Sequence, residues 1–375
     1  MKKTLINLYK SRNNFYRFIS VFAATVYMIA FLDISSVKKT RDKLLKRGIL
    51  KNSFCLFWDI FLWYLFFGYD PSSYAEFDFV NKSTKTRLTF LSNTEHLLYT
   101  RAMNVNADIK ITLFKNNTFE LFKKFYHRKL ILVKTEKDYD KFIDFIKDNN
   151  RFFAKPFDGS AGKGAKIYDI SNIQSAPLLF KELVSSGGYV LEEIIEQCPE
   201  MSKFNQSSVN TVRIVLVRTV NDIEILFAEI RCGRSGSIVD NGGSGGILIP
   251  CDINTGYLCK YGYDSSGLKF DRHPDSKIVF NNFQIPRWQD ILCFSKELMC
   301  NMPNFRYVGL DIAISNNDLV LVEINSTPLL GGLQGLHFTG FKKELLELLD
   351  TNKLSSDFRI KQKEIFQVAS RKNKL

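Results

Sequence analysis

Apolar and polar positions near the C-terminal end predict a β-hairpin with acidic side chains on it. Two apolar runs, Val308–Ile314 and Leu319–Ile324, flank the polar tetrapeptide Ser-Asn-Asn-Asp, which is typical of a tight turn. Glu323 and Asn325 share one strand face, and a hairpin centred on the turn brings Asp311 across from them. Two carboxylates and an amide oxygen on strands built for burial suit Mg²⁺; the alternative interpretation is a surface hairpin with a solvated acidic edge.

Apolar runs and helical spacing predict a mixed α and β chain. Strands are expected at 109–114, 131–133, 152–154, 165–168, 189–195, 210–218 and 224–231, and helices at 116–128 and 137–149. Strands and helices that alternate in this way favour α+β or α/β layers.

Two apolar stretches near the N-terminus predict helices. Phe18–Leu32 is apolar apart from Ser20 and Thr25, and five basic residues precede it. Its fifteen residues fall short of the ~20 that span a bilayer, and the sequence after it is a poor signal-peptide cleavage site. The segment is therefore expected to pack on the core or to lie in the membrane interface, with spanning or secretion less favoured. Ser53–Tyr69, richer in aromatic residues, is interpreted as a core helix.

Composition and charge exclude several classes of function for this chain. The chain has 375 residues and is 45% hydrophobic, enough for a large core in two or three structural units. Its seven cysteines are scattered without a CxxC pair, so a reducing cytosol is expected rather than a zinc knot or a disulfide framework. Of the net charge of +13, residues 1–53 carry +10 and residues 356–375 carry +4. A basic stripe for nucleic acid is therefore not expected.

A glycine-rich stretch follows the predicted strand at 152–154. Lys155-Pro156 ends that strand, and the segment from Asp158 to Gly164 contains three glycines. Glycine lets the backbone approach phosphate oxygens, and Lys155 and Lys163 add positive charge. The spacing is not a Walker A loop, because Gly164 stands where Ser or Thr is required, and no kinase HRD or DFG element follows. Taken alone, the stretch is typical of a plain tight turn as well as of a phosphate-binding loop.

The order of these segments resembles the ATP-grasp superfamily. The shared order is a strand ending in Lys-Pro, a glycine-rich hairpin, a strand ending in Glu-Glu-Ile-Ile, an arginine-bearing sheet and a final Asp…Glu-x-Asn. The chain is most similar to the sugar-transfer-associated branch, also described as α-L-glutamate ligase-related. That similarity spans about 45–350 and lies in SSVNTVRI (207–214), SGG (244–246), DINTG (252–256), HPD (273–275) and IPRW (285–288).

The resemblance implies an ATP site between two lobes. Lys155 matches the lysine that contacts the α- and β-phosphates, and Lys115 matches a first nucleotide-binding lysine more loosely, since the customary preceding Asp is absent. Glu192 and Ile194 would meet the adenine at the hinge, with Glu192 or Glu193 accepting from its amino group. The lid over the phosphates would comprise Gly159, Ser160, Gly162, Lys163 and Gly164.

The resemblance also implies catalytic and metal residues. Arg213 and Arg231 match arginines that face the transferred phosphate, and Asn241 matches a glycine-rich loop lining that site. Some ligases of the superfamily place an arginine two residues before the first metal aspartate. Gly309 stands there in this chain, so the stabilising charge is expected from Arg213, Arg231 or Arg306. The implied Mg²⁺ ligands, with Mn²⁺ as an alternative ion, are Asp311, Glu323 and Asn325.

The expected fold class is α+β: an ATP-grasp fold with two α+β lobes gripping ATP and a helical basic N-terminal extension. The expected division is a basic, partly apolar helical arm (1–52), an N-terminal substrate-side region (53–114), a nucleotide-binding subdomain (115–195), a catalytic and metal subdomain (196–351) and a basic tail (352–375).

The expected activity is that of an ATP- and Mg²⁺-dependent carboxylate–amine ligase working through an acyl phosphate, in bacterial cell-surface polysaccharide synthesis. Its partners would be a small-molecule or lipid-linked sugar carboxylate and an amine or amino acid. Its location would be the cytoplasm, with peripheral contact on the inner face of the plasma membrane as an open alternative for residues 1–53. Other hypotheses are a phosphotransferase using the same site and a silent nucleotide-binding adaptor. His273, in a polar His-Pro-Asp turn, is expected to be structural rather than a ligand.

Overall fold

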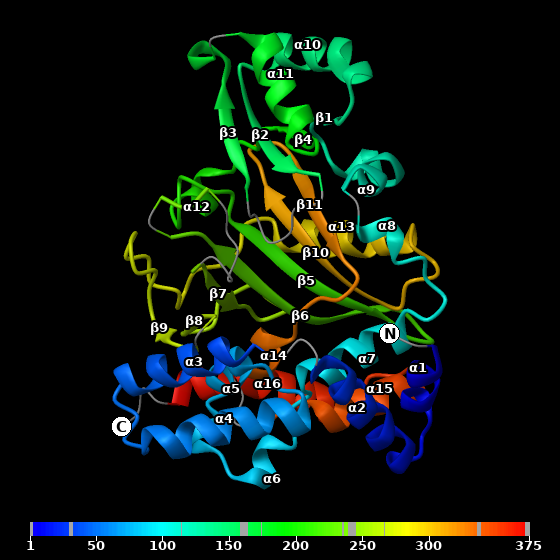
Figure 1. Ribbon diagram of the computed structural model, residues 1–375, viewed down its shortest axis with the longest axis vertical. Helices are drawn as coiled ribbons and strands as arrows, with labels where there is room; N and C mark the ends of the chain where they lie inside the picture. Colours follow the sequence, from blue (N-terminus) through cyan, green and yellow to red (C-terminus); the bar gives the residue numbers. More distant parts are fainter. Residues whose placement is uncertain are drawn as a thin grey trace.

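The computed structural model describes residues 3–29, 33–113, 115–157, 164–173, 175–234, 236–238, 245–265, 267–335 and 339–371. Three parts follow one another along its long axis (Figure 1): a small sheet with helices, a large sheet, and a helical layer built from both ends of the chain. Both sheets are antiparallel and helices are interspersed with the strands, which confirms the predicted α+β class. Among the described residues, no helix is long and apolar enough to cross a membrane.

The small sheet forms because alternating apolar positions on its strands face two amphipathic helices. Phe152 and Ala154 on β2 are buried against Phe142 and Phe145 of α10 and Phe180 of α11. The strand order is β1-β4-β2-β3. The elements are β1 (Leu130–Val133), α10 (Tyr139–Asp148), β2 (Arg151–Pro156), β3 (Lys166–Asp169), α11 (Ala176–Ser185) and β4 (Tyr189–Glu193).

The large sheet has the strand order β11-β10-β5-β6-β7-β8-β9. Its strands are β5 (Thr211–Arg218), β6 (Ile223–Cys232), β7 (Ile247–Pro250), β8 (Gly262–Asp264), β9 (Lys269–Phe270), β10 (Tyr307–Ile314) and β11 (Leu319–Asn325). The helices before and beside it are α8 (Lys110–Leu113), α9 (Lys115–Phe122), α12 (Pro199–Ser202) and α13 (Trp288–Cys300).

The two faces of the large sheet differ because its long strands alternate. On β5, Val212, Ile214 and Leu216 enter the core cluster that includes residues of α13. Val215 and Val217, on the opposite face, pack against the helical layer. Arg213 lies on that second face too, so this face changes along β5 from apolar to charged.

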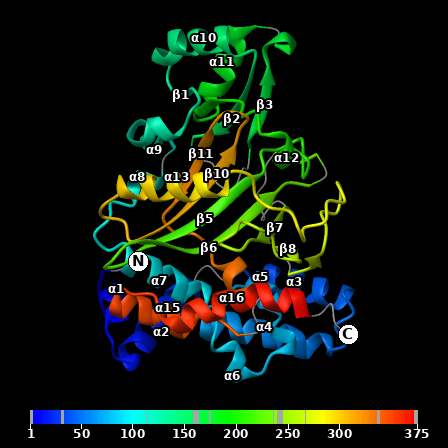
Figure 2. The same ribbon diagram turned by 180° about the vertical axis from the view of Figure 1, so that it is seen from behind.

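The helical layer joins the two ends of the chain. Tyr9 is fully buried, and Arg17 of α2 forms an ion pair with Asp350. Both views place the N-terminal helices beside the C-terminal α15 and α16 (Figures 1 and 2). The layer comprises α1 (Lys3–Lys10), α2 (Asn14–Ile29), α3 (Ile34–Lys46), α4 (Ser53–Phe67), α5 (Pro71–Glu76), α6 (Thr84–Arg87), α7 (Asn93–Met103), α14 (Gly331–Gly335), α15 (Lys342–Thr351) and α16 (Ser356–Arg371).

Helices α2 and α4 contact each other and expose large apolar side chains on their outer sides. On α2 the opposite side is packed: Ser20 and Ala24 are buried, and Ser20 Oγ donates to the carbonyl oxygen of Leu5. On α4, Leu56 and Ile60 are buried, so the interpretation of a core helix holds for one side only. We call the exposed sides of α2 and α4 together the outer aromatic face. Its members are Phe15, Phe18, Phe22 and Val26 of α2 and Phe54, Trp58, Leu62 and Phe66 of α4.

One predicted strand is wrong, and several helices escaped prediction, among them α7, α13 and α15. Within 109–114, the structure forms α8, which is helical, with the Asp108 side chain accepting from the backbone N–H of Lys110. Apolar residues there pack on the core from a helical turn, although their short run also suits a strand. Helix α7 begins with a capping box between Ser92 and Glu95, a signal that the sequence displays as Ser-x-x-Glu.

Candidate active site

The predicted hairpin is confirmed as β10 and β11, and it brings the three candidate metal residues together. Asp311 lies directly opposite Glu323, and Gly309 lies opposite Asn325. A Cβ added to Gly309 would lie 2.6 Å from the Cβ of Pro328. No side chain fits there, which explains why an arginine is absent two residues before Asp311.

Charged residues form a row across four neighbouring strands. From β11 to β6, the residues that face each other in register are Glu323, Asp311, Arg213 and Glu229. Directly opposed residues of antiparallel strands point to the same face, and Arg231 lies two positions beyond Glu229 on that face. The row runs from the hairpin to the edge of the helical layer.

Asp311 is the centre of a buried ion-pair cluster. Its oxygens accept from Arg213 Nε and Nη2, both at 2.6 Å, and from Arg231 Nη1 at 2.8 Å. All three side chains are more than 90% buried. Burial raises the pKa of Asp311, but the two arginines outweigh burial, so the net shift is downward and the carboxylate stays ionised.

The oxygen donors of the hairpin fit a divalent cation. Glu323 and Asn325 are partly buried, and Asn325 Nδ2 is a buried atom with no hydrogen-bond partner in the part of the chain that the structure describes. Carboxylate and amide oxygens are ligands that Mg²⁺ prefers, with the remaining positions filled by water or phosphate. Among the described residues, no group of three or more His, Cys, Asp or Glu side chains is suited to a metal.

The small sheet presents a second charged cluster around Glu192. Lys155 Nζ lies 2.9 Å from Glu192 Oε1, and Arg128 Nη2 lies 2.8 Å from Glu192 Oε2. Arg128 Nη1 also donates to the carbonyl oxygen of Leu321 on β11 at 2.6 Å, which ties the two sheets together. The structure thus brings together Lys155, predicted to contact the phosphates, and Glu192, predicted to meet the adenine. Sequence reasoning missed Arg128, which no motif marks.

Other predicted nucleotide residues lie nearby or outside the described part. Glu193 Oε2 accepts from the backbone N–H of Lys129 at 2.9 Å, and Ile194 follows β4. Gly164 has φ +73°, and a Cβ there would lie 2.9 Å from Pro156 Cγ, so glycine is required in the β2–β3 connection. The side chain of Lys115, at the start of α9, and the residues Gly159, Ser160, Gly162, Lys163 and Asn241 lie outside what the structure describes.

Two further sequence interpretations can be checked. His273 is fully buried; its Nε2 lies 3.0 Å from the carbonyl oxygen of Gly233, and its Nδ1 accepts from backbone N–H groups within its own turn. The interpretation of His273 as a structural residue is confirmed. Arg306 Nη2 donates to Asn352 Oδ1 at 2.7 Å, so the structure joins Arg213 and Arg231, but not Arg306, to Asp311. None of the seven cysteines, all of which the structure describes, forms a disulfide.

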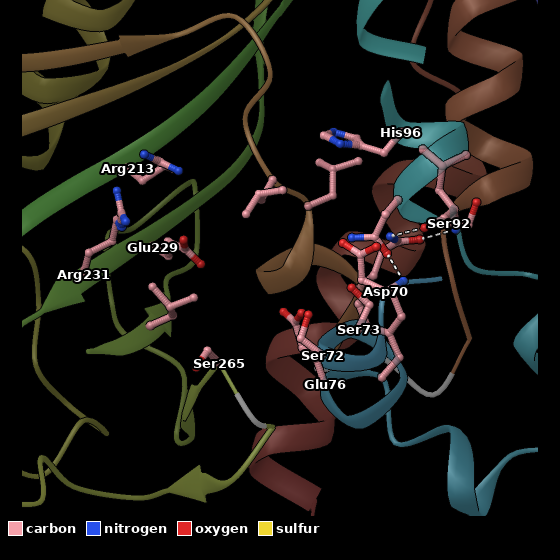
Figure 3. A pocket seen from close by; sticks show the side chains of 17 residues that line it. Asp70, Ser72, Ser73, Glu76, Ser92, His96, Arg213, Glu229, Arg231 and Ser265 are labelled. Carbon is pink, nitrogen blue, oxygen red and sulfur yellow. Dashed lines mark hydrogen bonds between the residues drawn. The ribbon is translucent and has the colours of Figure 1, made fainter. Parts of the chain in front are cut away.

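A cavity of about 280 Å³ opens where the charged row meets the helical layer. Figure 3 shows Arg213, Arg231 and Glu229 on one side of it and Glu76 of α5 on the other. His96 of α7 also lines it. Glu76 and His96 fall within residues 53–114, which were predicted to lie on the substrate side, but no sequence motif marks either of them.

Ionisable groups in the cavity have strongly shifted pKa values. Burial, followed by the charge of Glu229, raises the pKa of Glu76 to about 8. Burial raises the pKa of Glu229 to about 7, although Arg213 and Arg231 act in the opposite direction. Burial lowers the pKa of His96 to about 4, so its ring is neutral near pH 7. Shifted groups in a cleft are typical of functional sites.

Solved structures with a related arrangement were found at low similarity. They include N5-carboxyaminoimidazole synthetase from Staphylococcus aureus complexed with ADP (17% identity; 66% of this chain and 53% of that one; TM-score 0.40). Others are the D-alanine–D-alanine ligase of Helicobacter pylori (14%; 68% and 61%; 0.38) and an L-amino acid ligase from Bacillus licheniformis (10%; 66% and 50%; 0.38). The match spans about half the length of the first of these proteins.

The family comparison is more specific. A search of curated proteins found no match. Residues 99–347 match the family described as sugar-transfer associated ATP-grasp. The match covers most of the chain, including both sheets and the charged row, and it confirms the resemblance drawn from the sequence motifs. The chain belongs to the sugar-transfer associated ATP-grasp family.

Proposed function

We propose that this enzyme is an ATP- and Mg²⁺-dependent carboxylate–amine ligase that works through an acyl phosphate. The observation that carries the proposal is the charged row Glu323–Asp311–Arg213–Glu229, which links a hairpin of oxygen donors to a cavity. A carboxylate is a poor electrophile, so its activation needs phosphoryl transfer, which depends on positioning and charge neutralisation rather than on a protein nucleophile.

The nucleotide would lie between the two sheets. Lys155 would contact the α- and β-phosphates, while Glu192, Glu193 and Ile194 would meet the adenine. In the structure Lys155 pairs with Glu192, so nucleotide binding would exchange that ion pair for a contact with phosphate. Arg128 keeps Glu192 paired when Lys155 turns away. The glycine loop 159–164 would cover the phosphates, and Lys115 would add a further contact.

The hairpin would hold the metal, and the arginines would hold the transferred group. Asp311, Glu323 and Asn325 would bind Mg²⁺, or Mn²⁺, which supplies charge neutralisation at the phosphates. Arg213 and Arg231 already converge on Asp311 Oδ2 at 2.6 and 2.8 Å. They would stabilise charge on the transferred phosphoryl group, and Asn241 would line the same site.

The setting we propose is bacterial cell-surface polysaccharide synthesis, because the matched family is described as sugar-transfer associated. The carboxylate would be a small-molecule or lipid-linked sugar acid, and the enzyme would be cytoplasmic with peripheral contact on the inner leaflet. The outer aromatic face and the exposed Lys38, Lys39, Lys43 and Lys46 of neighbouring α3 support that contact. Aromatic and basic side chains together are typical of surfaces that bind anionic membranes.

The activity test uses a nucleophile that needs no specific site. The enzyme is incubated with Mg·ATP, hydroxylamine and individual sugar acids such as glucuronate and galacturonate, and with amino acids as carboxylates. We expect hydroxamate, ADP and inorganic phosphate in equal amounts, and none from Glu323→Gln. Release of AMP and pyrophosphate would overturn the proposal, and a phosphorylated product that resists hydroxylamine would favour the phosphotransferase.

A further inference from the structure

The cavity between the large sheet and the helical layer has carboxylate oxygens, which accept hydrogen bonds, on the side away from Asp311. Glu229 is 95% buried and points from β6, and Glu76 ends α5 on the opposite wall. The Tyr263 hydroxyl donates a hydrogen bond to Glu229 Oε2 at 3.3 Å. Glu76 and Glu229 line the same cavity from opposite walls, and the charge of Glu229 adds to burial in raising the pKa of Glu76. Such a pair either shares a proton or takes up a cation.

His96 supplies an independent observation that the cavity takes a ligand. Its side chain is 93% buried, and Nε2 has no hydrogen-bond partner among the residues that the structure describes. The ring hydrogen-bonds the backbone of Pro328, which leaves Nε2 of the neutral ring as an acceptor. A buried acceptor without a partner costs about 1–3 kcal/mol. His96 lines the same cavity as the two glutamates, so a donor on a ligand bound there would satisfy it.

We propose that this cavity is the subsite of the attacking amine, whose ammonium group binds between Glu76 and Glu229 while a second donor of the same molecule bonds to His96 Nε2. The inference rests on the ligase function proposed above and adds the class of nucleophile: a small primary amine with a further hydrogen-bond donor. Glu229 is the group placed to accept the proton, because it stands in register beside Arg213, which would face the acyl phosphate.

The chemical step balances without an added reagent. The Glu229 carboxylate takes one proton from the ammonium ion, and the freed nitrogen lone pair attacks the carbonyl carbon of the acyl phosphate. The C–N bond forms and the C–O bond to phosphate breaks, with its electron pair leaving on phosphate. The second nitrogen proton passes to that phosphate, giving an amide and hydrogen phosphate. A carboxyl whose pKa lies near 7 suits this role.

Other ionisable groups also face the site. Asp70, Arg213, Arg231 and His96 line the cavity, and Tyr263 contacts Glu229. The arginines are held by Asp311, and the neutral His96 carries no charge near pH 7. The pKa values of Glu76 and Glu229, about 8 and about 7, lie on either side of pH 7.5, so both carboxyls exchange protons there.

The test measures proton release on amine binding. Titration calorimetry at pH 7.5 in two buffers of different ionisation enthalpy compares 2-aminoethanol with ethylene glycol, which lacks the charge. We expect release of about one proton per bound amine, because the ammonium displaces a proton shared by the carboxyls. Glu76→Gln and Glu229→Gln should each weaken amine binding by about tenfold or more and reduce the proton release. The matched control, Glu224→Gln, lies on the same strand outside the cavity and should behave like the wild type.

The outcomes separate this inference from the ligase proposal. Equal binding of the two probes, no binding up to tens of millimolar, or unchanged titrations in both Gln variants would overturn the amine subsite, provided circular dichroism shows the variants folded. Titration of the same preparation with Mg·AMP-PNP tests the nucleotide site by itself. If the protein binds the nucleotide but not the amine, only the amine subsite is contradicted. If it does not bind the nucleotide, the proposed function is contradicted.

Discussion

The large sheet and the helical layer depart in opposite ways from the usual distribution, in which charged side chains are exposed and apolar side chains are buried. On the sheet, Asp311, Arg213 and Arg231 are charged and 3–8% exposed. On the helices, Phe18 of α2 is 64% exposed and Phe54 of α4 is 70% exposed. Buried charges and grouped exposed apolar residues are the two informative departures in a water-soluble fold.

The two departures differ in how much stability is lost when one of their side chains is replaced. The buried charges satisfy one another, so removing one partner leaves others desolvated and unpaired. The exposed aromatic side chains have few contacts to lose. Substitutions in the buried ion-pair cluster of Asp311, Arg213 and Arg231 should therefore change both turnover and stability, and substitutions on the outer aromatic face should change neither.

The largest expected effect is that of Glu323→Gln on turnover. The change keeps the shape of the side chain and removes a charge from the proposed metal site, so Mg²⁺-dependent ATP turnover should fall by ~10²–10⁴. Stability should stay near that of the wild type, since no described arginine or lysine forms an ion pair with Glu323. Turnover is measured as ADP release, and stability by urea unfolding.

Asp311→Asn should separate the effect on turnover from the effect on stability when it is compared with Glu323→Gln. It should abolish turnover as well, but it should also lower the free energy of unfolding by about 3–5 kcal/mol, because two buried arginines lose their partner. A fully active Glu323→Gln enzyme would remove Glu323 from the site, and equal stability of the two variants would contradict the distinction between them.

Lys155→Ala tests the cluster on the small sheet. Loss of a charge-assisted contact of about 1.5–3 kcal/mol should weaken nucleotide binding by ~10–100-fold. The fold should persist because Arg128 still pairs with Glu192. Calorimetry with Mg·AMP-PNP measures the affinity, and Lys166→Ala, an exposed lysine on β3 of the same sheet, serves as the control. Unchanged affinity would make the Lys-Pro assignment wrong.

The hairpin was predictable because its signals are local. Alternation, a four-residue polar turn and three polar interruptions specify both the strands and the pairing of Asp311 with Glu323. The approach of Arg213 to Asp311 depends on two distant strands becoming neighbours, and only the family resemblance suggested that both serve one site.

The helical side of the cavity was not predictable in the same way. Glu76 and His96 stand in a polar, mixed stretch with no periodic pattern, and their shifted pKa values arise from burial that tertiary packing creates. The strand predicted at 109–114 failed for a different reason, since a short apolar run does not distinguish a helical turn from a strand.

Stability should depend on pH through the cavity carboxyls. Glu76 and Glu229 have pKa values of about 8 and about 7 in the folded protein, above the ordinary 4.5. The folded state therefore binds more protons, and stability should fall as pH rises from 4.5 to about 8, by at most ~1.4 kcal/mol per pH unit for each carboxyl. His96, with a lowered pKa of about 4 against 6.5, acts in the opposite sense only below about pH 6.5.

Urea unfolding between pH 6.5 and 8.5 isolates the carboxyl effect. Glu76→Gln should flatten the dependence and raise stability at the alkaline end, because a neutral amide avoids the buried charge. Glu224→Gln should retain the wild-type slope. A slope that is the same in all three proteins would contradict the assignment of the pH dependence to the cavity.

The smallest expected effect concerns the outer aromatic face, where single substitutions should change membrane binding and nothing else. Phe18→Ser removes an exposed ring that would insert at the interface, so binding to phosphatidylglycerol vesicles should weaken several-fold, for about 1 kcal/mol of lost apolar contact. Binding should also weaken as ionic strength rises, because the lysines of α3 contribute through screened attraction.

Deleting the residues before Lys51 is no substitute, because Tyr9 and Ala24 belong to the core. Leu178→Ser, 60% exposed on α11 in the distant small lobe, is the matched control. If Phe18→Ser and Leu178→Ser bind vesicles equally well at each salt concentration, the outer aromatic face is not a membrane surface, while unaltered ATP turnover in both would leave the contrast with the charged row intact.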